Sequence, residues 1–116
     1  MKITICCSKK YFPEIQKFLG SLNDSKNEFL TPDLNFMGEI NETTKRKLSD
    51  VHHEKIRSSD AIYIYNPNNE IGRSTNLEMG FAIALNKKIF AFKKIGEPGL
   101  DCFIEKLLTL EELTKL

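Results

Sequence analysis

Residues 61–92, AIYIYNPNNEIGRSTNLEMGFAIALNKKIFAF, contain the pattern that decides the fold. Two short runs of apolar and β-favouring residues, 61–65 and 88–92, flank a longer segment, 75–85, in which apolar residues recur at helical spacing. Strands that are apolar at nearly every position are typical of parallel sheets, because helices bury both faces of such sheets. The stretch therefore predicts a strand, a crossover helix and a second, parallel strand.

The same alternation of strands and helices extends towards both ends of the chain. Residues 3–7 and the short, weak run 28–30 are expected strands, and residues 12–22 and 43–57 are expected helices. After a turn at 96–99, residues 103–109 suit a short edge strand and residues 110–116 a last helix. These elements predict a single α/β domain over residues 1–116. We expect a flavodoxin-like three-layer sandwich, with a parallel sheet of about five strands in the order 2-1-3-4-5.

Composition and charge narrow the class of protein. The 17 Lys and Arg residues nearly balance the 16 Asp and Glu residues, so the formal net charge of +1 gives no reason to expect binding to a nucleic acid polymer. No segment approaches the roughly 18 apolar residues of a membrane span, and the N-terminus lacks the pattern of a signal peptide. We therefore expect a cytoplasmic protein that does not bind a membrane.

The three cysteines point away from a metal site. Cys6 and Cys7 are neighbours in an expected strand, so their side chains point to opposite faces, which argues against a metal pair. Cys102 makes the count odd, and reduced thiols are the simplest expectation. The chain also lacks a Walker A sequence, a GxGxxG sequence after the first strand, and an acidic pair there. The parallel sheet therefore does not imply NAD, ATP or phosphotransfer.

Two polar loops mark the expected ligand-binding crevice. In the predicted strand order the chain reverses its winding direction between the first and third strands, and ligands bind outside the carboxyl ends of such strands. The loops that leave these strands are residues 8–11 and 66–73. The second loop leads directly into the helix that carries Glu78.

Glu78 admits two interpretations. With Thr75 as the N-cap, residues 75–78 form a capping box, in which the glutamate accepts a hydrogen bond from the N-cap amide. Alternatively, Glu78 lies on a stripe with Ala82 and Leu85 at the border of the buried face, where its carboxylate can act on a bound ligand. The periodicity favours the second interpretation, because a merely capping glutamate more often faces solvent.

His52 admits a structural and a functional interpretation as well. Leu48, His52 and Ile56 share one ridge of their helix, which directs His52 towards the sheet and His53 outwards. A lone histidine on an apolar face is usually a core residue. However, the helix leads into the third strand, beside the expected crevice.

An anion site is a third candidate feature. Ser74 and Thr75 stand where the free amides of a helix N-terminus attract anions, and Arg73 or Lys9 could add charge. Gly72 suits a tight turn or the close approach of a ligand. The basic run 44–47 is most simply a solvated helix face.

Residues 59–67, 71–84 and 87–90, together with the opening strand 3–8, resemble the nucleoside 2-deoxyribosyltransferase family, which includes related nucleoside 5′-monophosphate N-glycosidases. The most specific part is the run Glu78-Met79-Gly80-Phe81-Ala82. The resemblance implies that Glu78 attacks the anomeric carbon of a nucleoside or nucleotide, expels the base and forms a glycosyl ester. Water then completes a hydrolysis, and a second base completes a transfer.

The resemblance also implies roles for other residues. His52 stands where active members of the family carry an aspartate, and as an imidazolium it could protonate the leaving base. Gly72 replaces a usual Asp or Ser, and Cys7 replaces a usual Gly. The expected substrate-binding residues are Asn66 and Asn68 at the ribose or base, Tyr11 or Phe12 stacked on the base, Gly72 at a close approach, and Ser8, Ser74 and Thr75 at an anionic group.

The family implies no metal and no organic cofactor, and its members usually form dimers or larger assemblies. We therefore expect a homodimer or higher homo-oligomer that binds a small nucleoside or nucleotide. The apolar tail 107–116 could dock on its own core or on a partner chain. The alternative, favoured by the changes at His52 and Gly72, is a non-catalytic module of the same fold that senses a nucleotide.

Overall fold

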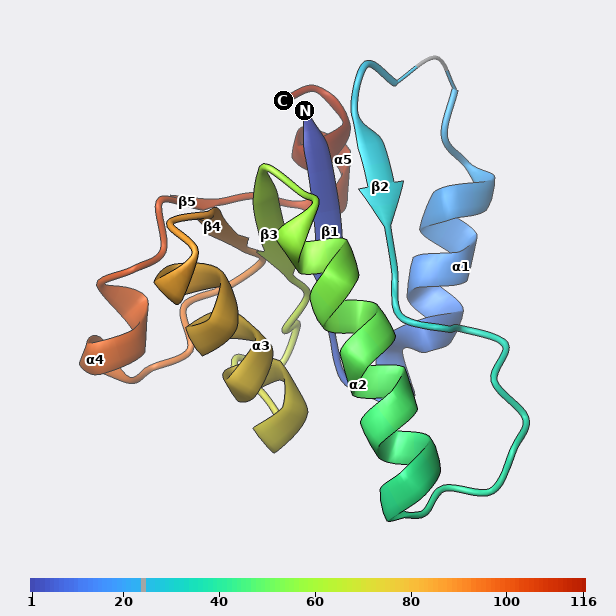
Figure 1. Cartoon of the computed structure of the whole chain (residues 1–116). Coiled ribbons are helices and arrows are strands. Elements are labelled where there is room, and N and C mark those ends of the chain that lie inside the picture. The colour runs from blue at the N-terminus through green and yellow to red at the C-terminus, as the bar shows by residue number, and fades with distance from the viewer. Residues whose placement is uncertain (24) are drawn as a thin grey trace.

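A five-stranded parallel sheet in the order β2-β1-β3-β4-β5 forms the middle layer of the structure (Figure 1). The structure is a computed structural model that describes residues 1–23 and 25–116. Its strands are β1 (Lys2–Cys6), β2 (Glu28–Leu30), β3 (Ala61–Ile64), β4 (Lys88–Ala91) and β5 (Lys106–Leu107). Each neighbouring pair is parallel. The flavodoxin-like α/β fold and the strand order predicted from the sequence are confirmed.

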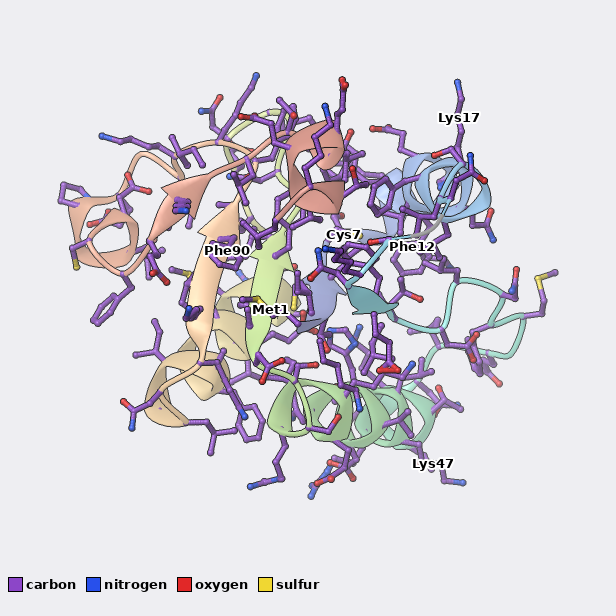
Figure 2. The ribbon with its side chains drawn as sticks, turned by 90° about the horizontal axis from the view of Figure 1, so that it is seen from above. Met1, Cys7, Phe12, Lys17, Lys47 and Phe90 are labelled. Carbon is purple, nitrogen blue, oxygen red and sulfur yellow. The ribbon has the colours of Figure 1, made fainter. Side chains whose placement is uncertain are left out.

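Helices cover both faces of the sheet, as Figure 1 and the view from above in Figure 2 show. One face carries α2 (Glu42–Arg57) and α3 (Arg73–Ala84), and the other carries α1 (Phe12–Gly20) and α5 (Leu110–Thr114). A 3-10 turn, η1 (Lys9–Tyr11), precedes α1, and the short helix α4 (Pro98–Asp101) lies near the β5 edge. Together these elements make the three layers that the sequence predicts.

The core consists of two apolar clusters, one on each face of the sheet. Alternate strand residues supply them: Ile5 and Tyr63 face α1 and α5, whereas Ile62 and Ile64 face α2 and α3. All of these side chains are fully buried. Burial on both faces explains why the central strands are apolar at nearly every position.

The β5 edge of the sheet follows the sequence prediction, apart from the short helix α4 that precedes it. The short edge strand predicted within residues 103–109 is present as β5, which has two residues and meets β4 at only two positions. The turn predicted at 96–99 contains the start of α4, and the Asp101 carboxylate accepts hydrogen bonds from the Ile95 and Gly96 amides. Gly96 has a φ of 92°, a conformation that favours glycine.

The apolar tail packs on the chain's own core. In α5, Leu113 is fully buried and belongs to the cluster formed with β1, β3 and α1. Thr109 and Glu112 form a capping box that fixes the start of this helix. The tail was predicted to dock either on its own core or on a partner chain, and in the structure it docks on its own core.

In the described part of the chain, no helix has both the length and the apolar character needed to cross a membrane.

We predict that Leu113→Ala lowers the free energy of unfolding by about 2–5 kcal/mol, because the substitution leaves a cavity between α5 and the sheet. Leu107→Ala is the matched control: Leu107 is 45% exposed, and we expect a loss below about 1 kcal/mol. Urea unfolding followed by circular dichroism measures both values. Equal losses would contradict the packing of α5 on the core.

Candidate functional site

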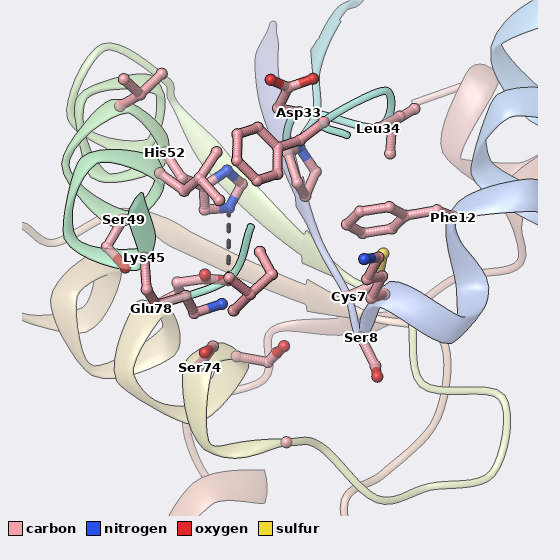
Figure 3. A pocket seen from close by; sticks show the side chains of 18 of the residues that line it. Cys7, Ser8, Phe12, Asp33, Leu34, Lys45, Ser49, His52, Ser74 and Glu78 are labelled. Carbon is pink, nitrogen blue, oxygen red and sulfur yellow. Dashed lines mark ion pairs between the residues drawn. The ribbon is translucent and has the colours of Figure 1, made fainter. Parts of the chain in front are cut away.

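A cavity of about 680 Å³ opens on the face of the sheet that carries α2 and α3 (Figure 3). Its wall is formed by the chain just after β1, residues 32–40 between β2 and α2, the inner side of α2, and the first turns of α3. It therefore lies beside the carboxyl end of β1, at the switch point where such folds bind ligands. Its volume is in the usual range for small-molecule sites.

Glu78 lies on the cavity wall, and its side chain is 15% exposed. The capping-box interpretation is wrong. Gly72, in an extended conformation, is the N-cap of α3, and Thr75 is already inside the helix and buried. Because the helix begins at Arg73, Glu78 belongs to its second turn and lies too far along to cap it. The carboxylate is thus free of a helix-start role.

The buried face of α3 is also narrower than the periodicity suggested. Thr75, Met79 and Ala82 are buried, whereas Leu77 is 62% exposed. Glu78 lies next to this buried stripe, as expected for a carboxylate at the border of the core.

His52 reaches Glu78 from α2, the neighbouring helix. Its ring is 6% exposed, and Nε2 lies 3.4 Å from Oε1 of Glu78, the contact dashed in Figure 3. The same nitrogen lies 3.5 Å from Sγ of Cys6. Nδ1 is buried and has no hydrogen-bond partner among the described residues. His52 therefore faces the sheet, as a core histidine would, and also lines the cavity.

His53 does not simply point outwards. It is half-buried and stacks on Phe81 of α3, with ring centroids 4.7 Å apart. This contact and the His52–Glu78 contact both join α2 to α3. The two helices therefore contact each other both at the cavity wall, through His52 and Glu78, and away from it, through His53 and Phe81.

Cys6 completes a polar trio that the sequence analysis did not identify. Burial raises the pKa of the Cys6 thiol well above its usual value, and the nearby Glu78 carboxylate raises it further. Cys7 faces the opposite cluster, as the strand pattern predicts, and burial raises the pKa of its thiol to about 12. Strand alternation places Cys6 on the same face as Thr4, but only the tertiary contact between the Thr4 and Ser59 hydroxyls shows that this is the face of α2.

Four of the predicted substrate-binding residues line the cavity: Ser8, Gly72, Ser74 and Thr75. Gly72 has a φ of −77°, and no described atom lies within 4 Å of the position that a Cβ would take. A tight turn therefore does not require glycine there. The close approach of a ligand stays a prediction.

Tyr11 and the two asparagines lie outside the cavity. Tyr11 packs edge-on against Tyr65, and its neighbour Phe12 lines the cavity instead. Asn68 is exposed in the loop after β3.

Asn66 is buried, and its amide joins two loops. It donates to the carbonyls of Asn69 and Lys93, at 2.9 and 2.8 Å, and accepts from the Lys93 amide at 3.0 Å. With its polar atoms used in this way, Asn66 serves the fold rather than a ligand at the cavity.

The cavity wall is rich in cationic side chains. Lys9, Lys45, Lys47, Lys55 and Arg73 line it, against the carboxylates of Asp33 and Glu78. The interpretation of residues 44–47 as a solvated face is therefore only partly correct. Arg46 is exposed and pairs with Asp50, but Lys45 and Lys47 border the cavity. Local sequence could not show this, since it depends on where the N-terminal half of α2 lies over the sheet.

The sequence matches no family model and no curated protein. Solved structures with the same fold include a 2-deoxyribosyltransferase from Bacillus psychrosaccharolyticus, at 15% identity and a TM-score of 0.70, over 100% of this chain and 92% of that one. A CMP N-glycosidase from Clostridium botulinum is similar at 18% identity and a TM-score of 0.60, over 99% of this chain and 95% of that one. A conserved protein from Enterococcus faecalis is similar at 14% identity and a TM-score of 0.66, over 99% and 95%. The likeness establishes a shared fold.

We predict that Asn66→Ala lowers the free energy of unfolding by about 2–3 kcal/mol, because it leaves the buried loop groups of Lys93 and Asn69 without their partner. Asn68→Ala, two residues further along the same loop, should change it by no more than about 0.5 kcal/mol. Urea unfolding of both variants provides the measurement. A neutral Asn66→Ala would show that the three hydrogen bonds contribute nothing.

Proposed function

We propose that this chain is an enzyme that cleaves or transfers the N-glycosidic bond of a nucleoside 5′-monophosphate through a covalent ester on Glu78. The observation that carries the proposal is the Glu78 carboxylate, mostly buried on the wall of a ligand-sized cavity and contacted by His52. The shared fold with a 2-deoxyribosyltransferase and a CMP N-glycosidase supports the reaction class. The sequence resemblance at residues 78–82 supports the same assignment.

In the proposed reaction, a Glu78 oxygen attacks the anomeric carbon of the sugar as the bond from that carbon to the base nitrogen breaks. The electron pair of the broken bond leaves with the base, which takes up a proton. The glycosyl ester is then attacked at the same carbon by water, which gives hydrolysis, or by a second base, which gives transfer. Splitting the displacement into two steps is the usual benefit of a carboxylate nucleophile.

We assign two tasks to His52. Before the reaction, Nε2 faces Oε1 of Glu78 and orients the carboxylate towards the cavity. When Glu78 becomes an ester, its negative charge is lost, and the imidazolium proton is free to pass to the departing base. A histidine suits this task, because imidazole is the side chain that most often transfers protons in enzymes.

The rest of the cavity suits the other parts of a nucleotide. Phe12 presents an aromatic ring to the space opposite α2 and α3, as Figure 3 shows, and would stack on the base. Ser8, Ser74 and Thr75 stand near the first turn of α3, where amides without helical partners attract anions. These are the predicted anion-binding residues that the fold brings to one cavity.

Charge favours a nucleotide over a nucleoside as the substrate. Five cationic side chains and two carboxylates line the cavity, although the whole chain has a formal net charge of only +1. A phosphate would offset this local excess of positive charge, whereas an uncharged nucleoside would not. The homo-oligomer and the cytoplasmic location expected from the sequence stay predictions.

Glu78→Gln tests the nucleophile. We expect base release from a panel of nucleosides and their 5′-monophosphates, measured by chromatography, and a fall in turnover of at least about a thousandfold in the variant, because a neutral amide is a poor nucleophile. Glu70→Gln is the matched control, since Glu70 is exposed and lies outside the cavity. Its turnover should equal that of the wild type.

Two outcomes would count against the proposal. Equal turnover in Glu78→Gln would remove Glu78 from the mechanism. A nucleotide that raises the melting temperature of the wild type without any base release would instead indicate a non-catalytic binding module.

Arg73→Gln tests the substrate class. Arg73 lies at the cavity wall at the start of α3, so its loss should raise KM for a 5′-monophosphate about tenfold, the equivalent of about 1.4 kcal/mol, and leave KM for the nucleoside unchanged. Lys94→Gln removes an exposed charge outside the cavity and should alter neither value. Equal changes for nucleotide and nucleoside would contradict a phosphate contact.

A further inference from the structure

We propose that Cys6, His52 and Glu78 form a binding site for a zinc ion, which inhibits the enzyme reversibly by occupying the Glu78 carboxylate. The inhibition rests on the proposed function, whereas the metal site rests on geometry alone. The sequence argued against Cys6 and Cys7 as a metal pair, and they do face opposite sides of the sheet. The proposed site uses Cys6 without its neighbour.

The distances among the three side chains suit one zinc ion. Tetrahedral zinc binds N, O and S atoms at about 2.0–2.3 Å, which places neighbouring ligand atoms about 3.3–3.6 Å apart. Nε2 of His52 lies 3.4 Å from Oε1 of Glu78 and 3.5 Å from Sγ of Cys6. All three ligand atoms lie within 4.8 Å of one another. Small side-chain movements would therefore bring the three ligand atoms to three corners of a tetrahedron around one zinc ion.

The charges balance as well. A Zn²⁺ ion held by one thiolate, one carboxylate and one neutral imidazole has no net charge, which suits a site with two buried ligands. Binding displaces the proton of the Cys6 thiol and the Nε2 proton of the His52 imidazolium, and both protons pass to solvent. A sulfur, nitrogen and oxygen donor set is one that zinc accepts readily.

An open coordination position and an entry path are both present. Glu78 and His52 line the cavity, whereas Cys6 lies behind them at the sheet. A metal ion can therefore approach from the cavity and keep a water molecule on its fourth position, as zinc ions with three protein ligands do.

The surroundings indicate an inhibitory ion rather than a structural one. With the metal on Nε2, the imidazole keeps its proton on Nδ1, which is buried and without a partner among the described residues. Zinc-binding histidines usually donate this proton to a second group, and loss of such support weakens binding by about 10- to 100-fold. The ion should therefore dissociate readily.

Cobalt binding to the full chain tests the site, with Co²⁺ as the probe because its bond to a thiolate absorbs visibly. We expect one Co²⁺ per chain, a cobalt–thiolate charge-transfer band, and loss of the band when Zn²⁺ is added. Cys6→Ala and Glu78→Gln should each weaken Co²⁺ binding by more than about 100-fold, the most that loss of outer support alone costs.

Three control variants separate this site from adventitious binding. Cys7→Ser removes the neighbouring thiol, Cys102→Ser removes the exposed one, and His53→Asn removes the adjacent imidazole. All three should bind Co²⁺ like the wild type. Zn²⁺ should raise the melting temperature of these variants and of the wild type but not that of Cys6→Ala, whose own unfolding transition shows that it folds.

The proposed site would be overturned if the wild type showed no cobalt–thiolate band. It would also be overturned if the band survived in Cys6→Ala or disappeared in Cys102→Ser. These readouts need no enzyme activity, so a failed metal site leaves the proposed function standing. Conversely, a metal-free protein that binds Co²⁺ as expected but releases no base would contradict the proposed function alone. If both hold, Zn²⁺ should suppress base release, and a chelator should restore it.

Discussion

Burial of β1 and β3 on both faces is the constraint on which the rest of the structure depends. Their side chains can leave water on both sides only if helices cover both faces of the sheet. Parallel pairing then brings the carboxyl ends of the strands to one edge, and the crossover connections place α2 and α3 side by side on one face of the sheet (Figure 1). The approach of His52 to Glu78 over Cys6 follows from that packing.

In the polar trio of Cys6, His52 and Glu78, more than one group can interact with the single carboxylate. Glu78 is mostly shielded from water, so its interactions with a neighbouring imidazole, a sugar carbon or a metal ion are stronger than they would be at the surface. The thiol of Cys6 lies behind it and is kept protonated by burial. In the proposed reaction and the proposed zinc site, the state of this one carboxylate decides whether the cavity is ready for substrate, engaged with it or blocked.

A shared fold carries less functional information than the cavity does. Sheets of this kind serve many unrelated reactions, and the similar structures share only 14–18% of residues with this chain. The cavity of this chain brings together an aromatic ring, a mostly buried carboxylate and an excess of cationic side chains around one space. The proposed function therefore depends on those groups.

The sequence by itself determined the strands, the main helices and their order, because these follow from local periodicity. The same periodicity placed His52 on the buried face of its helix and Glu78 at the border of the core, so both could be selected as site residues. Only the tertiary structure decided that Cys6 joins them, that Lys45 and residues 32–40 border the cavity, and that Asn66 joins two loops. The structure also shows that α3 begins at Arg73 rather than after Thr75, so Glu78 lies too far along the helix to cap it. Contacts between residues far apart in the chain depend on how elements pack and how loops run, and no local pattern encodes either.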